Sequence, residues 1–318
     1  MENIIQVHNL VKEYKKKNGD PFIAVNGISF DVRRGEIFSF LGPNGAGKST
    51  TISMLTTQKE ITSGSVTIDG KDLEKYAIEA REKIGIVAQH NNLDRGLTAR
   101  ENLIFHALYF GMSKHEANKR ADFLLDKFGL TDWENEYVRS FSGGMAQRLK
   151  IARAMVHRPE ILFLDEPTTG LDPAYREILW EQMLELNKEG TTVFLTTHYM
   201  EEPERFSDII AIFSHGKIQA IGTSDELKKR VPGKHVANVK FETISSEQEH
   251  LLQNLNIVES LSKTENDQFT LYLKDGDNPT ESLLSWIRET NLKIETFNLS
   301  GISLDDVFVY LTTEGATQ

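Results

Sequence analysis

The sequence predicts an α/β core built on a mostly parallel sheet, followed by a small α+β domain. Apolar strand-like runs alternate with helical segments from about residue 36 to about residue 200, which is typical of a parallel sheet. A glycine-rich stretch, residues 42–50, lies between one of these runs and the next helical segment. Val231-Pro232-Gly233 looks like a linker, and the pattern of the sequence changes beyond it. We therefore expect one domain over residues 1–232 and a second over residues 233–318.

The first elements along the chain are expected to be two long antiparallel strands. Residues 4–14 and 22–32 contain alternating apolar positions, and residues 15–21 contain the Lys, Asn, Gly and Pro residues typical of a turn. Residues 36–41 then form an apolar run that suits a buried strand, and residues 51–55 can continue as a helix. The glycine-rich stretch is therefore expected at a strand-to-helix turn.

The rest of the first domain is expected to alternate in the same way. Helical spacing of apolar residues begins at Thr98, and a helix that starts near Ser142 should stop before Arg158-Pro159 because proline ends helices. The helix over residues 173–189 has proline near its start and Gly190 just past its end. The other predictions are a helical subdomain over about residues 95–158, strands at 63–70, 84–89, 161–166 and 192–198, an antiparallel hairpin at 209–213 and 217–221, and a capped helix from Thr223.

The second domain shows the order strand, helix, strand, strand, helix, strand, which is typical of ferredoxin-like α+β folds. The order ends with one further helix. The expected strands are residues 236–241, 257–262, 269–273 and 292–299, and the expected helices are residues 245–255, 282–290 and 303–311.

Composition limits the function. The 318 residues carry a formal net charge of -11, so broad binding to nucleic acid is not favoured. There are no cysteines, which excludes disulfides and thiolate chemistry and is consistent with the cytosol. Residues 1–4 do not begin a signal peptide, and no run approaches the roughly 18 apolar residues of a spanning helix. If the protein acts at a membrane, we expect it to act through a partner.

The glycine-rich stretch fits the phosphate-binding pattern G-x-x-x-x-G-K-[ST]. Glycines let successive backbone N–H groups converge on phosphate oxygens, and the following helix N-terminus adds positive potential. Lys48 supplies a point charge for the β- and γ-phosphates, and Ser49 supplies a hydroxyl for Mg²⁺. The sequence therefore predicts a nucleotide site at this turn.

Two adjacent carboxylates end a buried strand farther along the chain. Asp165 lies where a Mg²⁺-directed carboxylate is expected, and Glu166 can act as general base for an attacking water. Alone, the pair could be a solvated turn before Pro167. Together with the phosphate loop it predicts a hydrolytic site.

With these motifs in place, residues 4–230 resemble the nucleotide-binding subunit of an ATP-binding-cassette (ABC) transporter. The resemblance adds roles residue by residue. Tyr14 matches the aromatic residue that stacks on adenine, Gln89 the glutamine that reaches Mg²⁺ and the attacking water, and His198 the histidine that contacts the γ-phosphate. Residues 142–144, Ser-Gly-Gly, match the family signature, and Asp172 matches a loop that crosses the dimer interface.

The resemblance implies ATP and Mg²⁺ as cofactors and a complete set of site residues. The implied catalytic residues are Glu166, His198, Gln89 and Lys48, and the implied Mg²⁺ ligands are Ser49, Gln89 and Asp165. The implied ATP contacts are Tyr14, Gly42, Pro43, Asn44, Gly45, Ala46, Gly47, Lys48, Ser49, Thr50, Ser142, Gly143, Gly144 and Asp172.

One position departs from the family pattern, since Met145 stands where the signature usually has Gln. Met lacks the side-chain amide, but the Ser hydroxyl and glycine N–H groups that would bind phosphate remain. The resemblance also implies that one subunit is inert alone. We therefore expect a homodimer, or a dimer with a homologous subunit, in which two copies enclose two ATP molecules.

The expected partner is an integral-membrane permease, and the expected location is the cytoplasmic face of the cell membrane. Phe105, Tyr109 and Phe110 could form its docking surface, although burial in the core is the favoured interpretation. The second domain resembles the accessory domain of drug- and antibiotic-resistance exporter subunits, through residues 304–308. We expect export of drugs, antibiotics or lipid-like compounds. The alternatives are an importer ATPase and a non-transport ABC ATPase that acts on ribosomes or nucleic acid.

Overall fold

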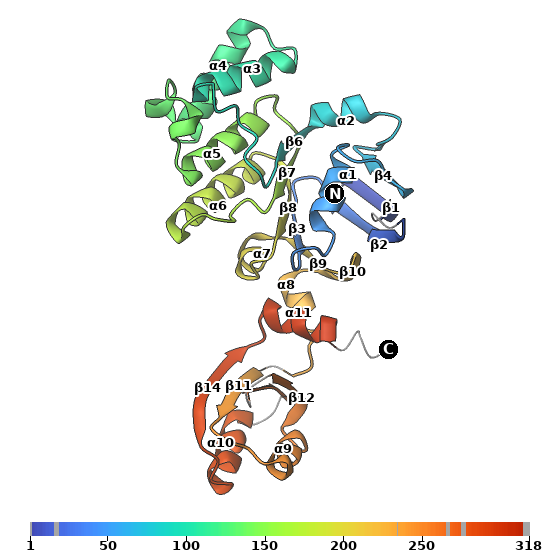
Figure 1. Ribbon diagram of the computed structural model, residues 1–318, viewed down its shortest axis with the longest axis vertical. Helices are drawn as coiled ribbons and strands as arrows, with labels where there is room; N and C mark the ends of the chain where they lie inside the picture. Colours follow the sequence, from blue (N-terminus) through green and yellow to red (C-terminus); the bar gives the residue numbers. More distant parts are fainter. Residues whose placement is uncertain (1, 16–18, 234, 265–267, 275–277, 314–318) are drawn as a thin grey trace. The chain divides into compact units, whose positions relative to one another are not determined.

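The computed structural model describes residues 2–15, 19–233, 235–264, 268–274 and 278–313 (Figure 1). The turn predicted over residues 15–21 lies partly outside these ranges. Contacts divide the chain into two compact units, Met1–Thr223 and Ser224–Gln318. The boundary predicted from the sequence lies after residue 232. The difference is the short helix α8 (Ser224–Lys228), which packs against the last helix, α11 (Leu304–Thr313), within the second unit.

The first unit contains an antiparallel sheet with the strand order β2-β1-β4-β5. The two long strands predicted at the N-terminus are confirmed as β1 (Asn3–Lys15) and β2 (Pro21–Arg33), which pair antiparallel. The other edge of β1 pairs antiparallel with β4 (Ser63–Ile68). The sequence predicted β4 as a strand but did not predict which strand it pairs with. The two-residue β5 (Lys71–Asp72) was not predicted.

The second sheet of this unit has six strands in the order β10-β9-β3-β8-β7-β6. The bounds are β3 Ile37–Leu41, β6 Ile84–Val87, β7 Ile161–Asp165, β8 Thr192–Thr197, β9 Ile209–Ser214 and β10 Lys217–Gly222. The prediction that both strands of the last hairpin are antiparallel additions is wrong for β9, which pairs parallel to β3. Only β10 runs antiparallel to its neighbour.

Each face of this sheet borders its own apolar core. Because side chains alternate along a strand, Ile161 and Phe163 of β7 join one cluster and Leu162 and Leu164 join the other. Helices α5 and α6 cover one face, and α1 lies on the other face beside the antiparallel sheet (Figure 1). The helices are α1 Lys48–Leu55, α2 Ala77–Lys83, α3 Ala99–Tyr109, α4 Lys114–Lys127, α5 Gly143–Ala154, α6 Pro173–Lys188 and α7 Glu201–Phe206.

The helical segment between β6 and β7 consists of α3, α4 and α5, with short 3₁₀ turns at Thr131–Trp133 and Val138–Ser140. Two of its aromatic residues are not core residues, because Tyr109 is 82% exposed and Phe105 is 54% exposed. The favoured interpretation of these two side chains as core is therefore wrong. Among the described residues, no helix is both long and apolar enough to cross a membrane.

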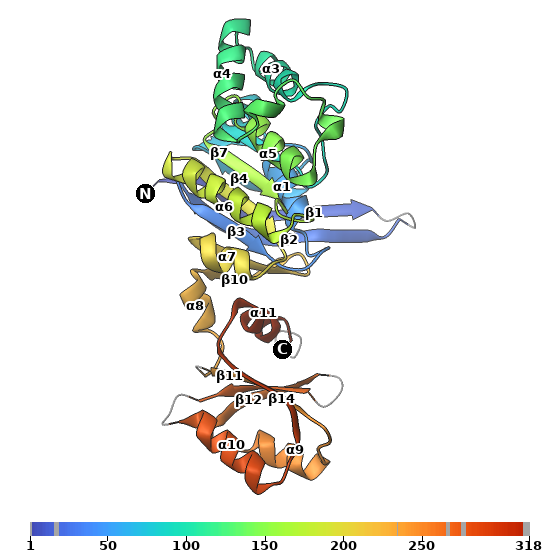
Figure 2. The ribbon, with the colours of Figure 1, turned by 90° about the vertical axis from the view of Figure 1, so that its left-hand side faces the viewer.

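The second unit confirms the predicted alternation of strands and helices. Its sheet has the antiparallel order β12-β13-β11-β14, with helices α9 and α10 on one face and α11 on the other (Figure 2). That order is the one expected when two split βαβ units interleave. The bounds are β11 His235–Phe241, α9 Ser246–Gln253, β12 Val258–Thr264, β13 Gln268–Leu273, α10 Pro279–Glu289 and β14 Ile294–Gly301.

Candidate nucleotide site

The glycine-rich loop connects β3 to α1, as predicted, and two of its glycines are required by close neighbours. A Cβ on Gly47 would lie 2.5 Å from the Ala24 carbonyl oxygen and 2.9 Å from the Phe213 ring, and the residue has φ +117°. A Cβ on Gly42 would lie 2.1 Å from the Phe213 carbonyl oxygen. The loop is therefore held between β2 and β9, where only glycine fits.

Lys48 begins α1 and turns its side chain back over this loop. Its Nζ donates to the carbonyl oxygens of Gly42 and Pro43, the latter at 3.1 Å, and lies 3.6 Å from Glu166 Oε1. Burial lowers the pKa of Lys48, and the neighbouring Glu166 and Asp165 carboxylates act in the opposite direction. A buried cation is thereby fixed beside the loop's convergent backbone.

Asp165, the last residue of β7, meets the N-terminus of α1. Ser49 Oγ donates to Asp165 Oδ1 at 2.9 Å, and Thr196 Oγ1 of β8 donates to the same oxygen at 2.6 Å. A hydroxyl and a carboxylate from elements distant in sequence are thus neighbours. Both are the hard oxygen donors that Mg²⁺ prefers, so the donor set fits that ion.

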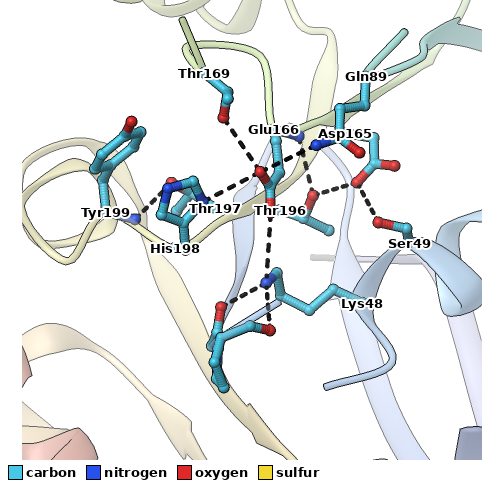
Figure 3. Close-up of polar contacts among 12 residues, drawn as sticks. Lys48, Ser49, Gln89, Asp165, Glu166, Thr169, Thr196, Thr197, His198 and Tyr199 are labelled. Atoms are coloured by element: carbon cyan, nitrogen blue, oxygen red, sulfur yellow. Dashed lines mark hydrogen bonds and ion pairs between the residues drawn. The ribbon is translucent and has the colours of Figure 1, made fainter. Parts of the chain in front are cut away.

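The Glu166 carboxylate contacts three further polar side chains of the site (Figure 3). Its Oε2 accepts from Thr169 Oγ1 at 3.2 Å and Gln89 Nε2 at 3.4 Å, and lies 3.1 Å from His198 Nδ1. These partners come from the end of β6, the turn after β7 and the end of β8. Because parallel strands end at one edge of a sheet, residues far apart in sequence meet at one carboxylate.

A cavity of about 530 Å³ opens over the loop. Tyr14 lines it, and Lys59 Nζ donates to the Tyr14 hydroxyl at 2.8 Å. Phe22, the cross-strand neighbour of Tyr14, also lines it. A flat aromatic wall and a phosphate loop at one cavity suit a nucleotide. The lining residues are Tyr14, Phe22, Ala24, residues 43–50, Lys59, Gln89 and Glu166.

Two predicted ATP-contacting segments do not line this cavity. Ser142 is the N-cap of α5, where its Oγ accepts from the Met145 N–H at 3.3 Å. Asp172 is the N-cap of α6, where it accepts from the Tyr175 N–H at 3.2 Å. Within the described part of the chain, residues 142–144 and Asp172 are absent from the cavity lining. Both segments are instead at helix N-termini, whose positive potential attracts anions.

Comparison with known proteins agrees with this geometry. The family model described as "ABC transporter" matches residues 25–169, and the model described as "ATP-binding protein DrrA1-3-like, C-terminal domain" matches residues 222–312. The daunorubicin/doxorubicin resistance ATP-binding protein DrrA of Streptomyces peucetius is 38% identical over 313 residues, which is 97% of this chain and 92% of that protein. The chain belongs to the ABC transporter ATP-binding proteins.

Further similarities support this assignment. The linearmycin resistance ATP-binding protein LnrL of Bacillus subtilis (strain 168) is 44% identical over 230 residues, covering 72% of each chain. A solved ATP-binding subunit of an ABC transporter is 31% identical with a TM-score of 0.64, covering 71% of this chain and 92% of that one. A dimeric cassette bound to ADP and Pi is 30% identical with a TM-score of 0.64, covering 69% and 98%.

As a member of this family, the chain is an ATP-hydrolysing subunit that powers an ABC-type membrane transporter. Sequence reasoning missed several residues of the ABC site, namely Phe22, Lys59, Thr169 and Thr196. The antiparallel pairing of β1 and β2 places Phe22 opposite Tyr14. Pairing the two predicted strands across their turn would have revealed this position. Lys59, Thr169 and Thr196 gave no signal in the sequence.

Proposed function

We propose that this subunit energises the export of a drug, an antibiotic or a lipid-like compound. The relatives are named for resistance to linearmycin, resistance to daunorubicin and doxorubicin, and Nod factor export. Two of them, DrrA and a Nod factor export protein, align over both units of this chain, since each alignment covers 97% of it. Shared architecture across both units supports export over import.

The proposed chemistry is hydrolysis of the γ-phosphate of ATP by water. The backbone of residues 42–47 and the N-terminus of α1 bind the phosphates, and Lys48 supplies positive charge at the leaving and transferred groups. Glu166 takes the proton from the attacking water, because its Oε2 sits among groups that orient it. His198 and Gln89 fix that carboxylate and would contact the γ-phosphate and the water. The single observation that carries this assignment is the convergence on Glu166.

Ser49, Asp165 and Gln89 would hold Mg²⁺, which when bound neutralises phosphate charge. The observation that supports this is the 2.9 Å contact between Ser49 Oγ and Asp165 Oδ1. Thr196 fixes the orientation of Asp165 through the same oxygen. A metal's own ligands are commonly oriented by such outer partners.

We further propose that two copies complete two sites. Ser142, Gly143, Gly144 and Asp172 lie at helix N-termini outside the cavity, so they can bind the nucleotide held by another copy. The proposal is supported by one similar solved cassette, which is dimeric and bound to ADP and Pi. An integral-membrane permease would receive the motion at the cytoplasmic face of the cell membrane, where this subunit would lie peripherally.

The test replaces Glu166 by Gln, which keeps shape and removes the base. We expect ATP binding within about twofold of the parent and turnover lower by at least about a hundredfold. The matched control is Glu202→Gln, since Glu202 is equally buried and accepts from Thr197 Oγ1 at 2.7 Å. The control removes a buried carboxylate of α7 and should leave turnover near that of the parent.

Hydrolysis by Glu166→Gln at the parent rate would overturn the base assignment. Transport itself is tested by co-purification from membranes. Recovery of the subunit with a multi-span membrane protein would support the proposal, whereas recovery only with ribosomes would contradict it.

A further inference from the structure

The segment that carries Gln89 is tied at two points to one helix. This segment, residues 88–92, follows β6 directly. Lys150 Nζ of α5 donates to the Ala88 carbonyl oxygen at 3.0 Å, one residue before Gln89. Arg153 of α5 donates from Nη1 to the Asn92 carbonyl oxygen at 2.8 Å and from Nη2 to the Asn92 side chain. Gln89 therefore lies between two backbone carbonyls that α5 holds.

The two cations act from one face of α5, because residues three apart in a helix are neighbours. Lys150 is 6% exposed, and burial lowers its pKa to about 8. Burial also lowers the pKa of Arg153. Burying a cation against a carbonyl rather than a carboxylate costs free energy. A neutral apolar residue would pack in the helix at lower cost, so packing alone does not account for Lys150.

The same helix begins at the segment that we assign to the second nucleotide. Ser142 is the N-cap of α5, and Lys150 lies about 12 Å farther along the helix axis at 1.5 Å per residue. At the other end of the linkage, Gln89 Nε2 lies 3.4 Å from Glu166 Oε2, near the limit of a hydrogen bond. A small displacement of residues 88–92 would therefore break that contact.

We propose that Lys150 and Arg153 are positioning residues that hold Gln89 against Glu166 and make the Gln89 segment move together with α5. A displacement of Gln89 at one nucleotide would then displace α5 and with it residues 142–144, which would face the other nucleotide. The inference rests on the proposed function, because the roles of Gln89 and of residues 142–144 are part of it. Neither cation lines the nucleotide cavity, and both act through residues 88–92.

The test compares two variants of the same helix in the full chain. Lys150→Met keeps an unbranched apolar side chain, one atom shorter than Lys, and removes the bond to Ala88. The matched control is Arg148→Met, because Arg148 donates from Nη1 to the carbonyl oxygens of Phe128 and Gly129, at 3.0 and 3.2 Å, beyond the end of α4. Both variants therefore remove a cation-to-carbonyl bond of α5, and only one of these bonds reaches the Gln89 segment.

We expect Lys150→Met to lower kcat by about tenfold while KM for ATP stays within about twofold, and to raise amide hydrogen exchange over residues 88–92. Arg148→Met should leave both kcat and this exchange near the parent values. Lys150→Arg, which keeps a donor, should restore most of the turnover.

Unchanged exchange over residues 88–92 in Lys150→Met would overturn the inference, as would an equal loss of kcat in Arg148→Met. Exchange does not depend on turnover, so this outcome is separate from that of Glu166→Gln. If the parent hydrolyses ATP and Lys150→Met has the same kcat and the same exchange as the parent, this inference is wrong and the proposed function still stands.

Discussion

At the scale of single residues, Glu166 has a backbone conformation that is unfavourable for an L-residue. Its φ is +48°, a region that costs an ordinary L-residue roughly 1–2 kcal/mol. Thr196 offsets this cost, because both its carbonyl oxygen and its Oγ1 accept from the Glu166 N–H at 3.1 Å. Strand β8 thus holds the turn after β7, since Thr196 bonds the carboxylate of Asp165 and the backbone of Glu166.

A second residue-scale consequence concerns pH. Burial, with Arg153 and His157 nearby, lowers the pKa of His106 on α3 to about 4. In the unfolded chain the pKa is about 6.5, so below that value the unfolded state binds more protons and stability falls as pH drops toward 4. We expect the free energy of unfolding to fall by about 2 kcal/mol between pH 8 and pH 5 from His106 alone.

Urea unfolding at pH 8 and pH 5 measures this effect in the parent and in His106→Phe. The variant should lose about 2 kcal/mol less than the parent over the same interval. Burial also lowers the pKa of His157, so part of the acid sensitivity should persist in the variant. An equal loss in both proteins would contradict the assignment to His106.

At the scale of elements, the N-termini of α5 and α6 depend on one glycine. A Cβ on Gly144 would lie 2.9 Å from Cδ1 and 3.0 Å from Cγ of Tyr175 on α6. Gly143, one residue earlier, has nothing within 4 Å of the same position. The start of α5 therefore packs against the Tyr175 ring at the start of α6, so closely that a side chain at position 144 would have to push the ring away.

We expect Gly144→Ala to lower the free energy of unfolding by about 1–3 kcal/mol, because the ring and the helix must separate. Gly143→Ala is the matched control and should be neutral or slightly stabilising, since alanine favours helix. Chemical denaturation measures both. Combining Gly144→Ala with Tyr175→Ala should recover most of the loss, and failure to recover it would refute the steric explanation.

The extent of sequence-based prediction also differs from element to element. The loop at 42–50 and the strand that ends at Asp165 were predictable, because their spacing and apolar pattern are local. The direction of β9 was not, because alternation along a strand does not say which neighbour it joins. Helices α2 and α7 were missed because seven and six residues give too little periodicity. Thr196 was missed because its role depends on pairing between β7 and β8.

At the scale of the whole molecule, the two units have separate apolar cores. One cluster of the second unit contains Phe241, Phe269 and Leu283. The buried residues of two clusters of the first unit all precede residue 214, and Ile218 and Ile221 pack partly buried against one of these clusters. Separate cores predict separate unfolding transitions. ATP with Mg²⁺ should raise the transition temperature of the first unit only, because a ligand stabilises the structure that binds it.

Differential scanning calorimetry of the full chain, with and without ATP and Mg²⁺, measures this shift. Glu166→Gln is the suitable background, since we expect it to prevent turnover during the scan. Movement of both transitions by the same amount would contradict independent units.

The place of β3 in its sheet has a consequence for protein synthesis. β3 is made early, yet its two neighbours, β8 and β9, come from much later in the chain. The loop that follows β3 rests on Phe213, which belongs to β9. A nascent chain that has emerged only as far as β7 therefore cannot close its phosphate loop, because non-local pairing must wait for its partners. We therefore expect the phosphate loop to reach its final conformation only after β9 has left the exit tunnel of the ribosome.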